Sequence, residues 1–151
     1  MAVLPIRIYG DPVLRQKAKP VEHITDEIRQ LVHNLGETMF DAPGIGLAAP
    51  QVGALVRLFV IDPHLGEDEN RTGEFVAFID PVLSDPSDEE VLIEEGCLSI
   101  PDIRADVERS KTQVIEFTDL GGERHRMTVD GMVGRVIQHE YDHLDGRSEE
   151  R

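Results

Sequence analysis

The sequence predicts an α+β fold: a small single domain in which mostly antiparallel sheets surround a helix that carries the motif H-E-x-x-H. Three observations support this class. The chain has 151 residues, enough to bury one hydrophobic core. Segments rich in β-branched residues follow one another with little helical pattern between them, so few parallel crossovers are possible. No apolar run approaches the ~18 residues of a membrane span. We therefore expect residues 1–151 to form one domain.

The expected elements begin with two helices and continue with strands. A short helix is predicted near residues 11–18, and a longer amphipathic helix runs from about residue 26 to residue 40, capped by Thr25. Apolar runs predict strands near residues 56–61, 74–79, 89–94, 112–117 and 124–129. The run Asp119-Leu120-Gly121-Gly122 between the last two strands predicts a hairpin turn.

The last expected element is a helix that follows the turn signal Asp130-Gly131. At about 100° per residue, its apolar residues gather on one stripe, which also holds His139, Glu140 and His143. The positions expected outside this stripe are Arg135, Gln138, Tyr141, Asp142 and Asp145.

Three ionisable groups on a buried stripe need a partner. The two histidines could be core residues that bind backbone carbonyls. However, each ionisable group left unpaired would cost several kcal/mol, and a single cation satisfies all three. Two histidines four residues apart on a helix can bind one ion, and the glutamate between them can reach a water on it. We therefore predict a metal site.

The only cysteine, Cys97, is the expected third ligand. A lone cysteine excludes an intrachain disulfide and is most often a small buried apolar residue. Here a strand-like apolar run and a glycine precede it, so a strand would deliver it to a close-packed position. A Cys-His-His set leaves one position of a tetrahedral ion open, which is typical of catalytic sites.

A third segment, residues 44–53, is rich in small residues that let another backbone approach closely. It is not a phosphate-binding loop, because it lacks the lysine of that motif and its strand–glycine–helix context. Gln51 is the lone amide in this apolar run. It is either a surface residue or a hydrogen-bond donor within a site.

Three motifs together resemble the signatures of the peptide deformylase family: Gly-Ile-Gly-Leu-Ala-Ala-Pro-Gln, Glu-Gly-Cys-Leu-Ser and Gln-His-Glu-Tyr-Asp-His-Leu. The resemblance extends from Ile8 to Leu144. It implies an enzyme that removes the N-formyl group from the formyl-methionine of nascent polypeptides and releases formate.

The resemblance also implies roles for individual residues. The metal ligands would be Cys97, His139 and His143. Glu140 would be the general acid/base, and Gln51 and the backbone N–H of Leu98 would stabilise the oxyanion. The substrate-binding residues would be Ile45, Gly46, Gly96 and Arg104, with Ile45, Ile93, Met132 and Val136 forming the methionine pocket.

The implied cofactor is one divalent ion, Fe2+, which Zn2+, Ni2+ or Co2+ can replace. The residue types agree, because softness and geometry permit several such ions. A bound ion lowers the pKa of water from about 15.7 to near 7 and so makes a nucleophile for the formamide.

The net charge of −15 makes tight binding to DNA or RNA unexpected. The acidic runs of the chain are typical of solvated surface. Neither a secretory signal nor a membrane segment is recognised, so a cytoplasmic monomer is expected. Family members often end in a helix associated with ribosome docking. This chain ends soon after the metal motif, which weakens the expectation of ribosome contact by that route.

Other classes remain as alternatives. A zinc endopeptidase would need a further ligand downstream of the motif, where few residues remain. A structural metal protein would need a fourth ligand, for which His125 is the only candidate. An inactive deformylase-like protein that binds metal or peptide would have lost Glu140 or Gln51, but both are present.

Overall fold

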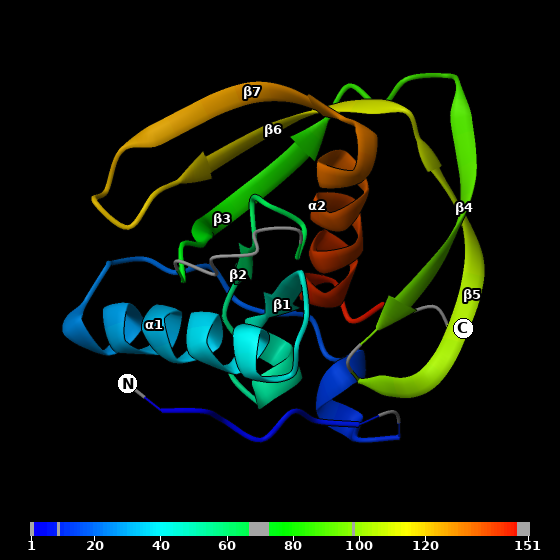
Figure 1. Ribbon diagram of the computed structural model, residues 1–151. Helices are drawn as coiled ribbons and strands as arrows, with labels where there is room; N and C mark the ends of the chain where they lie inside the picture. The colour runs from blue at the N-terminus through cyan, green and yellow to red at the C-terminus, as the bar shows by residue number, and fades with distance from the viewer. Residues whose placement is uncertain (1, 9, 67–72, 98, 148–151) are drawn as a thin grey trace.

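The computed structural model describes residues 2–8, 10–66, 73–97 and 99–147, and for residues 93, 94 and 100–106 it describes the backbone alone. Within these residues the chain adopts the α+β class that the sequence predicts. It contains a five-stranded sheet, a separate two-stranded hairpin, and the α-helices α1 (Asp26–Asp41) and α2 (Gly131–Leu144) (Figure 1). No helix in the described ranges is long and apolar enough to cross a membrane.

The five-stranded sheet has the order β1-β2-β3-β6-β7, and every neighbouring pair is antiparallel. Its strands are β1 (Gly46–Ala48), β2 (Leu58–Ile61), β3 (Val76–Ser84), β6 (Thr112–Thr118) and β7 (Arg124–Asp130). The expected turn joins β6 to β7: the Asp119 amide donates to the Glu123 carbonyl at 2.8 Å, and Gly122 has a φ of 90°, which favours glycine.

Helix α1 begins where the sequence predicts. The side chain of Thr25 accepts a hydrogen bond from the backbone N–H of Ile28 at 3.2 Å, which satisfies one of the free donors at the helix start. Asp26 and Glu27 lie in the first turn, where negative charge is favourable. The helix therefore has both the cap and the charge pattern that stabilise its N-terminus.

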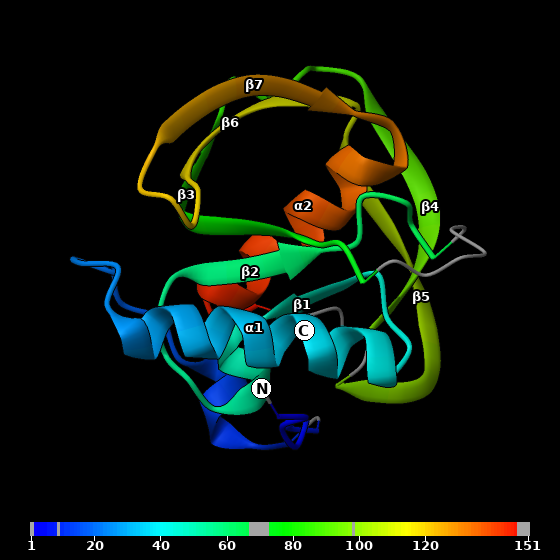
Figure 2. The same ribbon diagram turned by 60° about the vertical axis from the view of Figure 1, so that its left-hand side comes forward.

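Strand β2 is buried on both faces, because a helix covers each face (Figure 2). Leu58 and Val60 pack with α1, whereas Phe59 and Ile61 pack with α2. The strand therefore has a continuous apolar pattern, which is typical of strands buried on both sides.

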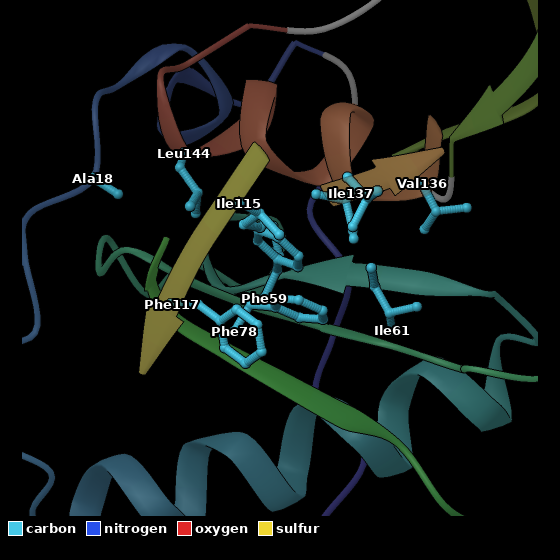
Figure 3. Packing of buried hydrophobic residues seen from close by; sticks show 11 residues of the cluster. Ala18, Phe59, Ile61, Phe78, Ile115, Phe117, Val136, Ile137 and Leu144 are labelled. Carbon is cyan, nitrogen blue, oxygen red and sulfur yellow. The ribbon is translucent and has the colours of Figure 1, made fainter. Parts of the chain in front are cut away.

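Aromatic rings fill much of the core between α2 and the sheet (Figure 3). The ring of Phe78 stacks on Phe59 with a centroid distance of 4.9 Å and lies 4.4 Å from the centroid of Phe117. Ile137 of α2 is buried in the same cluster. Each such side chain stabilises the fold by about 1.5–3 kcal/mol. This packing fixes the rotation of α2 about its axis, and with it the direction of the polar residues on the helix.

Strands β4 (Glu90–Cys97) and β5 (Ile100–Ser110) form the separate antiparallel hairpin. Helix α2 lies between this hairpin and the five-stranded sheet (Figure 1). The strand register shifts between Gly96 and Cys97, so the irregular point of the hairpin falls at the cysteine.

Two predictions of secondary structure were wrong. The helix expected near residues 11–18 is only the 3-10 turn η1 (Pro12–Arg15), because the backbone is already extended at Gln16. Strands β1 and β5 and the 3-10 turn η2 (Ala49–Val52) were not predicted. β5 was not predicted as a strand because it is rich in charged residues and contains Pro101. The remaining strands and both helices occur where expected, with ends that differ by a few residues.

The expected exposure of α2 was also partly wrong. Arg135 and Gln138 are only 5% and 7% exposed, because the hairpin covers the polar side of the helix. Conversely, Met132 in the first turn, expected on the buried stripe, is 47% exposed.

Candidate metal centre and active site

Three side chains from two elements form the candidate metal centre. Cys97 ends β4, and His139 and His143 lie one turn apart on α2. One ligand atom from each residue lies within 4.8 Å of the other two. The sulfur of Cys97 is 3.4 Å from Nε2 of His143, and the two imidazole centroids are 5.0 Å apart. The fold therefore brings together the three residues that the sequence marks as ligands.

The donor set fits a metal ion. A tetrahedral ion bound about 2.3 Å from sulfur and 2.0 Å from nitrogen holds two such atoms roughly 3.5 Å apart, close to the 3.4 Å between Cys97 and His143. Burial, with the nearby His139 and Arg109, lowers the pKa of His143 to about 3. The His143 ring is therefore neutral near pH 7, which is the form that binds metals.

The carboxylate of Glu95 orients His139. Its Oε1 lies 3.2 Å from Nδ1 of His139. Burial opposes ionisation, but hydrogen bonds from His139 and Arg109 lower the pKa of Glu95 to about 2. An ionised carboxylate can only accept, so Nδ1 of His139 carries the proton and Nε2 keeps its lone pair for a metal. Metal-binding histidines commonly have such a carboxylate partner, which fixes the ring and its tautomer.

Two arginines hold this carboxylate in place. Arg109 of β5 donates from Nε and Nη2 to Glu95, each at 2.9 Å at the closest, and from Nη1 to Asp142 of α2 at 2.9 Å. Burial opposes the charge, but Glu95 and Asp142 raise the pKa of Arg109 above its ordinary value. Arg135 of α2 approaches Oε2 of Glu95 at 3.0 Å. The buried anion is thus compensated from both the hairpin and the helix.

Glu140 lies beside the ligand group. It is 4% exposed, and its Oε2 is 3.9 Å from Nε2 of His139, the nitrogen that faces the centre. A carboxylate at this position is close enough to exchange a proton with a water at the open side of a metal.

Gln51 reaches the same centre from η2. Its Oε1 accepts a hydrogen bond from the Ala48 amide at 2.9 Å, which fixes the orientation of the side-chain amide. Its Nε2 donates to Oγ of Ser99 at 3.1 Å and lies 3.6 Å from the sulfur of Cys97. The residue is 1% exposed, so the surface interpretation of Gln51 is wrong. It presents an oriented N–H group next to the ligand set.

Three other expected site residues, Ile93, Gly96 and Arg104, lie on the hairpin, and for Ile93 and Arg104 only the backbone is described. A fourth, Leu98, falls outside the described residues. Arg104 pairs with Gly96 across the hairpin, immediately before the register shift.

The remaining expected site residues lie on β1 and α2. Ile45 is partly buried against the core, and Gly46 begins β1. Val136 is 7% exposed in the core cluster, whereas Met132, one turn earlier on α2, is mostly outside it. Their roles toward a substrate stay predictions.

Sequence reasoning missed the residues that support the ligands: Glu95, Ser99, Arg109 and Arg135. A signal existed for Glu95, because residues two apart on a strand share a face and Cys97 is two residues further on. Arg135 precedes His139 by one helical turn, but the helical stripe placed it on the solvent side.

His125 does not supply a fourth ligand. It belongs to a different group with Asp119 and Glu123 at the β6–β7 turn, where its Nε2 pairs with Asp119 at 2.7 Å. Hydrogen bonding to His125 lowers the pKa of Asp119 below its usual range. Within the described residues, the group at Cys97 therefore offers three candidate ligands, the number expected of a catalytic site.

Comparison with known proteins gives consistent matches along the chain. The family model for polypeptide deformylase matches residues 3–148. A peptide deformylase of Christiangramia forsetii is 44% identical over 153 residues, covering 95% of this chain and 78% of the relative.

Solved structures agree with the sequence matches. The crystal structure of peptide deformylase from Thermotoga maritima aligns with a TM-score of 0.90 at 39% identity, covering 98% of this chain and 95% of that one. The enzyme from Synechococcus elongatus in complex with actinonin aligns with a TM-score of 0.87 at 41% identity, covering 96% of this chain and 75% of that one.

Proposed function

The chain belongs to the polypeptide deformylase family, and from that premise we propose how its residues remove the N-formyl group from the formyl-methionine of nascent polypeptides. The reaction is hydrolysis of a formamide, which releases formate and a free amine. We also infer that residues 1–151 act as one catalytic domain, which the match over residues 3–148 supports.

Enzymes of this family depend on a metal ion, and the described residues include a group that could hold one. We assign Cys97, His139 and His143 as its ligands. When bound, such an ion acts as a Lewis acid and lowers the pKa of water to about 7. We propose Fe2+ as the physiological ion, with Zn2+, Ni2+ or Co2+ as substitutes, since a mixed sulfur and nitrogen set accepts all four.

Glu140 is the proposed general acid/base. It would accept a proton from the attacking water and later deliver that proton to the departing amine nitrogen. Its support is its burial and the 3.9 Å between its Oε2 and Nε2 of His139. The same carboxylate can serve both steps because the proton leaves it in the second.

Gln51 and the backbone N–H of Leu98 are the proposed oxyanion donors. Each such hydrogen bond is typically worth about 3 kcal/mol in the transition state. In support of this role, the amide of Gln51 is already oriented by Ala48 and Ser99, so little reorganisation is needed when charge develops on the formyl oxygen.

The substrate would bind along β1 and the end of β4. Ile45, Gly46 and Gly96 would contact its backbone, Arg104 its more distant residues, and Met132 and Val136 the methionine side chain. Gly46 and Gly96 carry no side chain that could block an approaching backbone. The partner is therefore an N-formyl-methionyl peptide or nascent chain.

We place the enzyme in the cytoplasm, because its substrate forms there during protein synthesis, and we propose that it acts as a monomer. The negative charge of the chain disfavours binding to nucleic acid. Contact with the ribosome is not required for the chemistry proposed here.

The observation that carries this proposal is the grouping of Cys97, His139 and His143 with Glu140 beside them. The test is an anaerobic assay of formate release from a formyl-methionyl peptide, with the metal content measured on the same sample. The matching acetyl-methionyl peptide is the control. Stoichiometric metal without formate release would instead support an inactive metal- or peptide-binding relative. Actinonin, which is bound to the Synechococcus elongatus relative, is expected to raise the unfolding temperature of the metal-loaded protein.

A further inference from the structure

Arg135 joins α2 to both strands of the β4–β5 hairpin. Its Nη1 donates to the carbonyl of Val91 on β4 at 2.8 Å, and its Nη2 donates to the carbonyl of Val107 on β5 at 2.7 Å. The residue is 5% exposed. A buried guanidinium that binds two strands fixes the distance between the hairpin and the helix, because its planar donors allow one geometry.

The guanidinium of Arg135 also contacts Glu95, the carboxylate that faces the proposed metal ligand His139. Nη2 of Arg135 is 3.0 Å from Oε2 of Glu95, and Oε1 of Glu95 is 3.2 Å from Nδ1 of His139. Arg135 thus attracts one carboxylate oxygen while the other oxygen faces the imidazole. Arg109 also donates to this carboxylate, so a change at Arg135 would remove one of its two cationic partners.

The two parts of the ligand set depend on this contact in different ways. Cys97 ends β4, the strand whose Val91 carbonyl Arg135 binds. His139 lies on α2 one turn after Arg135, and its ring is held by Glu95. One side chain therefore contacts both the strand that carries the thiol and the carboxylate that faces the imidazole.

We propose that Arg135 is a positioning residue of the metal centre: through Glu95 and the two hairpin carbonyls, it sets the geometry between Cys97 and His139. The inference rests on the proposed metal ligands. It assigns Arg135 no contact with substrate. Its effect is therefore expected in metal affinity and in the metal–sulfur bond, beyond any effect on folding stability.

Gln138 provides a matched control. It also lies on α2, is 7% exposed and donates to a β5 carbonyl, that of Ser110, at 2.9 Å. Gln138→Met removes one bond between helix and hairpin without removing a contact to Glu95. Arg135→Met removes the hairpin bonds together with the contact to Glu95. The two variants separate general loosening of the hairpin from loss of the support of His139.

The experiment measures Co2+ affinity by competition with a chelator, and the near-ultraviolet thiolate-to-cobalt band, for the full-length wild type and both variants. Arg135→Met is expected to weaken Co2+ binding about 10- to 100-fold, as loss of outer support typically does, and to alter the band. Gln138→Met is expected to change the affinity by no more than about fivefold, the factor that corresponds to about 1 kcal/mol for one ordinary hydrogen bond. Equal weakening in both variants, or wild-type affinity and band in Arg135→Met, would overturn the proposal.

Three further variants complete the test. Glu95→Gln, alone and combined with Arg135→Met, tests whether Arg135 acts through Glu95, and Arg135→Lys is used if Arg135→Met does not fold. If Arg135 acts largely through Glu95, adding Arg135→Met to Glu95→Gln weakens Co2+ binding much less than Arg135→Met does alone. Fully additive losses overturn that route. If Arg135→Met does not fold, Arg135→Lys tests the proposal instead. Its ammonium keeps the positive charge but cannot donate to both strands and to Glu95 with the planar geometry of a guanidinium. Weaker Co2+ binding supports the proposal, and wild-type affinity overturns it. A wild type without a thiolate band overturns the metal centre itself, an outcome distinct from an unchanged Arg135 variant.

Discussion

Gly46 leaves the space that the carboxylate of Glu140 occupies. A Cβ atom at position 46 would lie 2.7 Å from Oε2 of Glu140 and 2.9 Å from a methyl carbon of Val136. Both distances are shorter than real Cβ atoms tolerate. The absence of a side chain on β1 therefore allows the proposed general acid/base to sit where it does, between the sheet and the ligand group.

Gly46→Ala is accordingly expected to displace Glu140. We expect kcat to fall about 10- to 100-fold, since small misplacements of a reacting group are costly. The metal content should be unchanged, because the atoms nearest to the added Cβ belong to Glu140 and Val136 and not to the proposed ligands. Steady-state kinetics with metal analysis would check this. Gly73→Ala is the control for a methyl group alone: it has no atom within 4 Å of the added Cβ, although its φ of 79° adds backbone strain. Full activity in Gly46→Ala would contradict the spatial argument.

Glu140→Ala should retain the metal and lose nearly all turnover. The ion supplies charge stabilisation, but no other group would take the proton from water at this position, and general acid–base catalysis is typically worth 10²–10⁴-fold. The measurement is formate release by a variant whose metal content matches that of the wild type. Undiminished formate release would contradict the role of Glu140 as the general acid/base.

Glu95→Gln tests the pH dependence of stability. The pKa of Glu95 falls from 4.5 to about 2 in the fold, so its ionised form stabilises the folded state above pH 4.5 and this stabilisation is lost as the pH falls toward 2. The pKa difference corresponds to on the order of 3 kcal/mol. Urea unfolding of the metal-free wild type and variant should show a gap that narrows through this window.

His143 acts in the same direction in both proteins and therefore cancels in that comparison. Its ring is buried and neutral, with a pKa of about 3 against 6.5, so stability declines as the pH falls below 6.5. A gap between wild type and Glu95→Gln that stays constant from pH 7 to pH 3 would mean that Glu95 is not held as an ion by its partners.

The iron-loaded enzyme should lose activity in air, while a nickel-loaded sample persists. Fe2+ beside the thiolate of Cys97 can react with oxygen, and oxidation of the iron or of the sulfur would disable the centre. Activity over time, with mass spectrometry of Cys97, would follow this at matched metal loading and matched salt, because the net charge of −15 can make stability depend on salt. Equal decay with Cys97 still reduced would indicate unfolding instead.

The sequence predicted the parts of the fold whose patterns are local. Thr25 and the apolar period define α1, and the Gly121-Gly122 turn defines the β6–β7 hairpin. The grouping of Cys97, His139 and His143 could also be predicted, because they lie in motifs whose chemistry is specific, and their role as ligands stays a prediction.

The missed features depend on contacts between distant segments. Nothing in the helical period of α2 indicates that a second layer covers its polar side, so Arg135 and Gln138 were expected to be exposed. The carbonyls that they bind belong to a hairpin whose second strand is rich in charged residues and contains Pro101. Buried polar contacts of this kind become visible only when the layers are assembled.

The proposed ligands are divided between a hairpin and a helix, so full metal binding depends on contacts between distant segments. Cys97 and His143 are 46 residues apart, whereas β4 and β5 are joined by a short connection and can pair locally, within about 1–10 μs for an isolated hairpin. The complete set of proposed ligands exists only after the hairpin has docked on α2, so an ion that needs all three residues binds fully only at that step. If docking follows the rate-limiting step of folding, metal should leave the refolding rate nearly unchanged and slow the unfolding rate.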